Sequence, residues 1–122
     1  MDFSGDLQAE VMAIVWKLGE AKVEDVRTAH KKGLAYNTFQ TVMNRLFERG
    51  LLKRRLRGNA FVYSARYEEA DLLTRSIGDR LRRASPHARR KALHDLVGEL
   101  EPHDLDELSR YANRIKRDRR GT

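Results

Sequence analysis

The spacing of apolar residues predicts three helices in the first fifty residues. Apolar side chains recur at helical spacing over residues 5–18, and a glycine follows. A shorter helical segment over residues 23–32 has acidic side chains in its first turn and stops before Gly33. The third segment covers residues 37–50, and its final glycine is expected to end the helix. The buried side of this third helix is predicted to consist of Phe39, Val42, Met43 and Leu46.

The helical period stops after residue 50, and a β-hairpin is predicted to follow. Residues 51–56 and residues 60–64 read as two short strands. Between them lies the turn Arg57-Gly58-Asn59, which contains the residue types that accept positive φ. The first 65 residues are therefore expected to form three helices and then a hairpin.

Helical spacing returns in the last part of the chain. We expect one helix over residues 68–84, a second that begins at Ser85-Pro86, and a third that begins at Pro102. Their apolar stripes are narrow, and a unit of fewer than sixty residues is marginal alone. We therefore expect these stripes to be buried against a second copy of the chain. The residues predicted to do so are Leu73, Ile77, Leu93, Leu96, Val97, Leu100, Leu105, Leu108, Ala112 and Ile115.

The outward side of the third helix carries amides, hydroxyls and an arginine where lysine and glutamate would be ordinary surface choices. Glutamine can pair with adenine at two points, and threonine can contact the thymine methyl group. A solvated surface is the simplest interpretation of such a face, and a surface that meets base edges is the alternative that we favour. The candidate residues are Asn37, Thr38, Gln40, Thr41, Asn44 and Arg45.

Positive charge follows this helix directly. The chain has a formal net charge of +7, and residues 45–57 hold six basic side chains against the single acid Glu48. Basic side chains at a helix end and in a hairpin can neutralise phosphates. Three helices followed by a basic hairpin form the layout of a winged helix-turn-helix, in which the hairpin is the wing.

We therefore predict a mainly α fold in three parts. Residues 1–66 form an N-terminal winged helix-turn-helix with three helices and a β-hairpin wing. Residues 67–119 form a small C-terminal helical dimerisation region, and residues 120–122 form a frayed tail.

Composition argues against several other classes of protein. The chain has no cysteine, and its four histidines are scattered, so no metal site or cofactor is predicted. No phosphate-binding glycine loop, nucleophile elbow or paired carboxylates are apparent, so no enzymatic activity is predicted. The N-terminal residues show no signal peptide, and no apolar run is long enough to span a membrane. The expected location is the cytoplasm, with no membrane insertion.

The sequence also resembles a known family. The run QAEVMAIVWKLG, followed by AYNTFQTVMNRLFERGLLKRRLRGNAFVYS, is similar to the penicillinase-repressor family, of the BlaI and MecI type, with its copper-responsive relatives. The resemblance is close over residues 5–65. It is fainter over residues 66–119, where LEPHDLDELSRYANRI resembles the family's last dimerisation helix.

This resemblance implies a homodimeric transcriptional repressor that binds a palindromic operator in double-stranded DNA. It implies recognition-helix contacts for Thr38, Gln40, Thr41 and Arg45, and it implies wing contacts for Arg55, Arg57 and Asn59. It further suggests control of β-lactam-response genes, and so of antibiotic resistance, with proteolytic inactivation that involves a membrane-bound sensor protease.

Two departures from the family pattern bear on the signal. Copper-responsive relatives carry a C-terminal cysteine cluster, and this chain has no cysteine, so copper sensing of that kind is disfavoured. The staphylococcal members are cut at an Asn-Phe bond, and this chain has no Asn-Phe pair. Cleavage at another bond, or another signal, is the corresponding expectation.

Two other functions remain open at this point. The chain could be a winged-helix module that binds protein, with the first helix as its partner surface, because Trp16 lies on a second apolar side of that helix. It could also be an architectural DNA binder without sequence preference, which predicts steep salt dependence and little discrimination between sequences.

Overall fold

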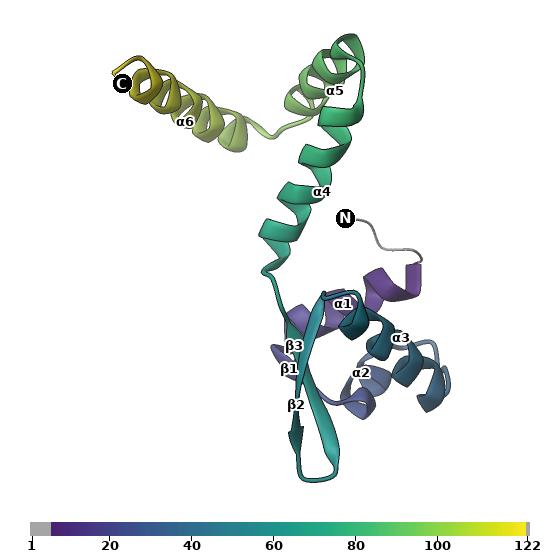
Figure 1. The fold of residues 1–122 in the computed structure, drawn as a ribbon. Coiled ribbons are helices and arrows are strands. Elements are labelled where there is room, and N and C mark those ends of the chain that lie inside the picture. The colour runs from purple at the N-terminus through teal and green to yellow at the C-terminus, as the bar shows by residue number, and fades with distance from the viewer. Residues whose placement is uncertain (1–5, 122) are drawn as a thin grey trace. The chain divides into compact units, whose positions relative to one another are not determined.

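The structure is a computed structural model that describes residues 6–121 (Figure 1). The predicted absence of a signal peptide concerns residues that lie almost entirely outside this range. Backbone contacts divide the chain into two compact units, one that ends at Asp79 and one that begins at Arg80. The elements are α1 (Asp6–Leu18), β1 (Glu20–Ala21), α2 (Val23–Ala29), α3 (Tyr36–Glu48), β2 (Leu52–Arg57), β3 (Ala60–Ala65), α4 (Glu69–Arg83), α5 (Pro86–Gly98) and α6 (Pro102–Arg120).

The first unit confirms the predicted fold of three helices and a hairpin wing. α3 packs against α1, α2 and the hairpin, and Figure 1 shows the hairpin reaching beyond the helices, with its turn at the free end. Gly58 has a φ of +61°, while no other residue of the described turn has a positive φ. That combination fits the two-residue hairpin turn with glycine in first place.

The hairpin belongs to a three-stranded antiparallel sheet with the order β1-β3-β2. The two-residue strand β1, in which Glu20 pairs with Ser64, was not predicted from the sequence. Along β2, alternate side chains point to opposite faces of the sheet. Arg54 therefore shares a face with the buried residues Leu52 and Tyr63, whereas Arg55 lies on the other face.

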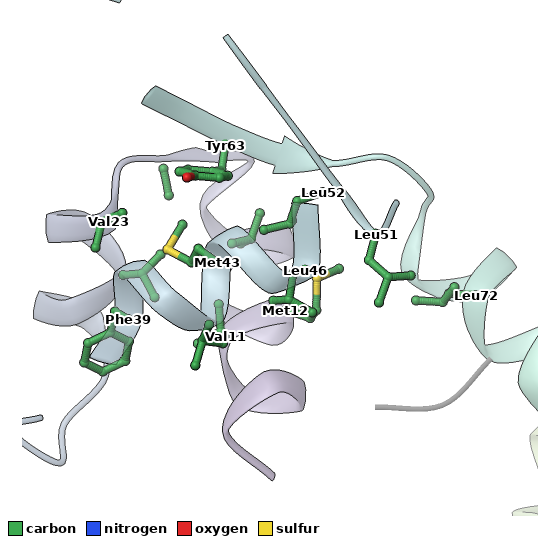
Figure 2. Close-up of a cluster of buried hydrophobic side chains, with 14 residues drawn as sticks. Val11, Met12, Val23, Phe39, Met43, Leu46, Leu51, Leu52, Tyr63 and Leu72 are labelled. Atoms are coloured by element: carbon green, nitrogen blue, oxygen red, sulfur yellow. The ribbon is translucent and has the colours of Figure 1, made fainter. Parts of the chain in front are cut away.

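A single apolar core holds the first unit together (Figure 2). The apolar side of α3 is buried as predicted, with Phe39, Met43 and Leu46 fully inaccessible and Val42 9% exposed. The core also takes side chains from the other two helices, the sheet and the start of α4. These include Val11, Met12, Val15, Val26, Leu51, Leu52, Tyr63 and Leu72.

The ends of α2 and α3 have different causes. α3 ends as predicted, because Gly50 has a φ of +78°, its N–H bonds to the Phe47 carbonyl, and the Leu51 N–H bonds to the Leu46 carbonyl. The prediction that the second helix reaches residue 32 was wrong. α2 ends at Ala29, because His30 adopts an extended backbone conformation and turns its ring into the core, where it is 6% exposed.

The chain directly after the hairpin belongs to the first unit. The indole N–H of Trp16 on α1 donates a 3.0 Å hydrogen bond to the Tyr67 carbonyl, and Leu72 on α4 is buried in the core. Trp16, on the second apolar side of the first helix, is therefore half-buried against the segment between β3 and α4. The domain boundary that the sequence suggested at residue 66 stays a prediction.

The second unit contains the end of α4 together with α5 and α6. Ser85 caps α5 as predicted, because its hydroxyl accepts a 3.2 Å hydrogen bond from the Ala88 N–H. α6 includes Arg120, which the sequence pattern had assigned to a frayed tail; only Gly121 follows it within the described range. Among residues 6–121, every helix is either too short or too polar to span a bilayer.

Candidate nucleic-acid interface

The predicted reading residues lie together on the outer side of α3. Asn37, Gln40, Thr41 and Arg45 are exposed, and Thr38 and Asn44 are half-buried. The N-cap of this helix is Ala35, so Tyr36 and Asn37 lie in its first turn. Tyr36, the first residue of α3, is 44% exposed and extends the same element, although sequence reasoning did not assign it to the interface.

A concave surface of about 500 Å³ lies between the outer side of α3 and the inner face of the hairpin. It is open to solvent, and its lining is mainly polar, so it is suited to an extended polar ligand rather than to an enclosed small molecule. Four predicted residues of α3 line it together with side chains of the two long strands. The lining residues are Gln40, Thr41, Asn44, Arg45, Glu48, Arg54, Phe61 and Tyr63.

Arg54 is the basic residue that joins the hairpin to α3. Its Cζ atom lies 3.9 Å from the centroid of the Phe47 ring and 4.1 Å from that of the Phe61 ring. Its Nη1 atom donates hydrogen bonds to the Asn44 Oδ1 atom at 3.0 Å and to the Tyr63 hydroxyl at 3.3 Å. In the sequence, Arg54 stands out only as one of the six basic residues in positions 45–57. The leucines two residues before and after it are the signal that places it on the inner face.

The wing arginines face the other side of the sheet and pair with Glu20 of β1. The Nη2 atom of Arg55 lies 2.9 and 3.0 Å from the two Glu20 carboxylate oxygens, and the Nη2 atom of Arg57 lies 3.7 Å from one of them. The hydrogen bond from Arg55, together with the positive charge of Arg55, Arg57 and Lys53, lowers the pKa of Glu20 below its usual value. The carboxylate is therefore ionised at neutral pH and holds both arginines.

The predicted contacts thus form two groups rather than one. The α3 residues line the concave surface, whereas Arg55 and Arg57 meet at Glu20 on the opposite face of the hairpin. Asn59, at the turn, is exposed. Glu20 of β1 is a partner of the wing arginines that sequence reasoning missed, because it precedes Arg55 by 35 positions in the chain.

The residues predicted to mediate dimerisation are accessible in the single chain. Seven of them are between 41% and 58% exposed, namely Leu73, Ile77, Leu93, Leu96, Val97, Leu105 and Leu108. Leu100 and Ile115 are half-buried, and Ala112 is exposed. No α5 or α6 residue is buried.

The described part of the chain contains no group of three or more histidine, cysteine, aspartate or glutamate side chains suited to a metal ion. His30, the buried histidine, packs edge-on against the Phe39 ring, with 5.2 Å between ring centroids, and lies 3.5 Å from a Glu10 carboxylate oxygen. Its place is in the core beneath α3.

Comparisons with known proteins agree with this geometry. A family model described as penicillinase repressor matches residues 4–114. The penicillinase repressor of Bacillus licheniformis is 30% identical over 70 residues, which amount to 56% of this chain and 55% of that protein. The match thus spans about half the length of this curated relative.

Two solved structures are also similar. The solution structure of the DNA-binding domain of the repressor BlaI is 29% identical with a TM-score of 0.50, and the alignment covers 55% of this chain and 84% of that domain. Bordetella bronchiseptica BpsR is 17% identical with a TM-score of 0.50, and it covers 92% of this chain and 75% of its own. At that identity the similarity to BpsR concerns the fold alone.

Proposed function

Because this chain belongs to the penicillinase repressor family, we propose that it is a sequence-specific transcriptional repressor that binds a palindromic operator as a homodimer. The observation that carries the proposal is the outer side of α3, where short polar side chains line a concave surface beside the hairpin. The similarity to the DNA-binding domain of BlaI supports it.

In this proposal α3 enters the major groove. Its 13 residues span about 20 Å, and a helix of ordinary diameter fits a groove about 12 Å wide. Thr38, Gln40 and Thr41 would contact base edges, and Arg45 would contact a phosphate. Asn37 precedes them on the same helix and would contact the DNA strand where α3 enters the groove.

The wing would contact the DNA backbone through Arg55, Arg57 and Asn59. In the free protein both arginines are paired with Glu20, so phosphate oxygens would have to compete with that carboxylate. Phosphate contacts set position and affinity without reading sequence, so the wing would contribute mainly to the salt dependence of binding.

The homodimer would form through the exposed apolar stripes of α4, α5 and α6. Large apolar side chains are 41% to 58% exposed at helical spacing along each of these helices, and such stripes are typical of an interface between chains. A two-fold symmetric dimer presents two copies of α3 to two half-sites, which explains why a palindromic operator is expected.

Family resemblance alone suggests the physiological setting. We propose control of β-lactam-response genes, with inactivation by proteolysis that depends on a membrane-bound sensor protease. Repression of chromosomal genes would place this activity in the cytoplasm. The test is whether a β-lactam raises transcription of the bound genes only when the repressor gene is intact.

Direct binding measurements test the repressor function. Duplexes selected by the protein from a randomised library should bind far more tightly than scrambled duplexes of the same length. Thr41→Ala should weaken discrimination at one base pair by about 1–3 kcal/mol. Arg45→Ala should weaken binding to all duplexes and flatten the dependence of log K on log salt by about one unit.

The same measurements separate the alternatives. Equal affinity of the wild type for selected and scrambled duplexes would indicate an architectural binder, and no affinity for either would indicate a protein-interaction module. The structure gives the latter little support, because Trp16 is half-buried and bonded to Tyr67 rather than free for a partner.

A further inference from the structure

We propose that Arg54 is a positioning residue for the DNA-reading surface. It holds the side-chain amide of Asn44 in one orientation and so affects base preference without contacting DNA itself. This inference rests on the proposed function. It also gives Arg54 a different role from its neighbour Arg55, although the two adjacent arginines carry the same charge.

The guanidinium of Arg54 contacts two neighbouring elements, α3 and β3. It extends from β2 between the Phe47 ring of α3 and the Phe61 ring of β3, at 3.9 and 4.1 Å from their centroids. Its centre also lies 5.9 Å from the centroid of the Tyr63 ring. Stacking of this kind favours a planar guanidinium over an ammonium group, and it restricts the side chain to one place.

Hydrogen bonds to Arg54 and Glu48 fix the orientation of the Asn44 side-chain amide. The Nη1 atom of Arg54 donates to Asn44 Oδ1 at 3.0 Å, and Asn44 Nδ2 donates to Glu48 Oε1 at 3.1 Å. A guanidinium can only donate and an ionised carboxylate can only accept, so the oxygen and nitrogen of the amide cannot exchange places. One N–H and one oxygen lone pair remain for a ligand.

A fixed amide presents one donor and acceptor pattern to the major groove. An asparagine that could rotate by 180° about its last torsion angle would present two patterns and accept more than one base pair. Arg54 therefore restricts what Asn44 can recognise. Its own guanidinium is engaged by two aromatic rings, one amide and one hydroxyl, whereas the Arg55 side chain is 53% exposed on the other face of the hairpin.

Two matched variants test the assignment, Arg54→Met and Arg55→Met. Both remove one positive charge from β2. Each is measured against the duplexes selected by the wild type, against single base-pair variants of them, and across a range of salt concentrations. For Arg54→Met we expect discrimination at one base pair to fall by about tenfold, with an unchanged salt slope. For Arg55→Met we expect the slope to flatten by about one unit, with base preference retained.

Coupling to Asn44 provides the next test. Asn44→Ala should lose the preference at the same base pair, and adding Arg54→Met to it should cause no further loss there. The proposal is overturned if the two losses simply add. It is also overturned if Arg54→Met flattens the salt slope as Arg55→Met does, or if it leaves base preference intact.

A measurement without DNA keeps this inference separate from the proposed function. In the free wild-type protein, NMR should show two well-resolved side-chain amide protons for Asn44, of which the one bonded to Glu48 is slow to exchange with solvent. In Arg54→Met their exchange should be faster, and unchanged exchange would overturn the contact.

If Arg54→Met fails to fold, Phe61→Leu removes one stacking ring at a position that is 41% exposed, and the same faster exchange of the Asn44 amide protons is expected. Wild-type protein that binds selected and scrambled duplexes equally would overturn the repressor function and the base preference with it, while the amide protons would still report on the contact.

Discussion

At the scale of single residues, the helical period predicted which side of a helix each side chain faces, but not which distant residues it contacts. Counting along α3 placed Asn44 and Arg45 outward, and both are accessible. Helical spacing could not predict the partners of Arg54, because its hydrogen bond to Asn44 depends on how the hairpin packs on α3. The contact of Arg55 with Glu20 likewise joins residues that are distant in sequence.

Glu20 gives a prediction at this scale. Glu20→Gln should release Arg55 and Arg57 from an ionised carboxylate and remove a charge that repels phosphate. Affinity for scrambled duplex should therefore rise severalfold at low salt, and discrimination between selected and scrambled DNA should fall. Titration by fluorescence anisotropy at several salt concentrations measures both effects.

The control for this variant is Glu107→Gln, which makes the same change in net charge on an exposed residue of α6. If both variants bind scrambled duplex equally well, net charge and not the position of Glu20 is responsible. Since the pKa of Glu20 is lowered, the pairing is present above the usual glutamate range and is lost only as acidification passes below it. Between pH 6 and about pH 8, Glu20 itself should therefore cause no change in wild-type affinity.

At the scale of elements, the sequence predicted every long helix and both strands of the hairpin. These elements have a clear period or a marked cap, as Ser85 and Gly50 show. β1 has only two residues, too few for any period, and it is defined by its pairing with β3. The end of α2 was wrong by three residues, because burial of His30 against Phe39 is a tertiary effect.

The end of α3 yields a stability prediction. Gly50→Ala should lower the free energy of unfolding by about 1 kcal/mol, because an alanine is strained at a φ of +78°. Chemical denaturation followed by circular dichroism measures this change. Gly98→Ala is the matched control, since Gly98 lies in α5, has no positive φ and has open space around it. That substitution should be neutral or stabilising by up to about 1 kcal/mol, and equal losses in the two variants would contradict the argument.

At the scale of the whole molecule, the single chain leaves two kinds of surface exposed. One is the polar concavity beside α3, and the other is the set of apolar side chains on α4, α5 and α6. The sequence predicted the polar side of α3 and the apolar stripes from side-chain pattern, but not the concavity. It could not predict which wing residues share a face with α3, because the register of the hairpin was needed for that.

Dimerisation is tested by a charge within the apolar stripe of α6. Leu108→Asp should yield monomers in analytical ultracentrifugation, because a carboxylate cannot be buried against a second apolar stripe. Operator affinity should then fall by at least about 100-fold, since each half-site is bound independently.

The neighbouring residue provides a control with the same change of charge. Ser109→Asp introduces a carboxylate next to the stripe on α6 but off its line. This variant should remain dimeric and bind the operator normally. A wild-type protein that is wholly monomeric at micromolar concentration would contradict the dimer.

The hydrogen bond between Trp16 and Tyr67 has a practical consequence. Trp16 is the chain's single tryptophan, and its indole is half-buried where the polypeptide leaves the hairpin for α4. Indole emission shifts to the red when the ring gains contact with water. The protein therefore carries an intrinsic fluorescent probe at this junction. The wavelength of its emission would report, without any added dye, whether DNA binding changes the packing of Trp16 against the segment that contains Tyr67.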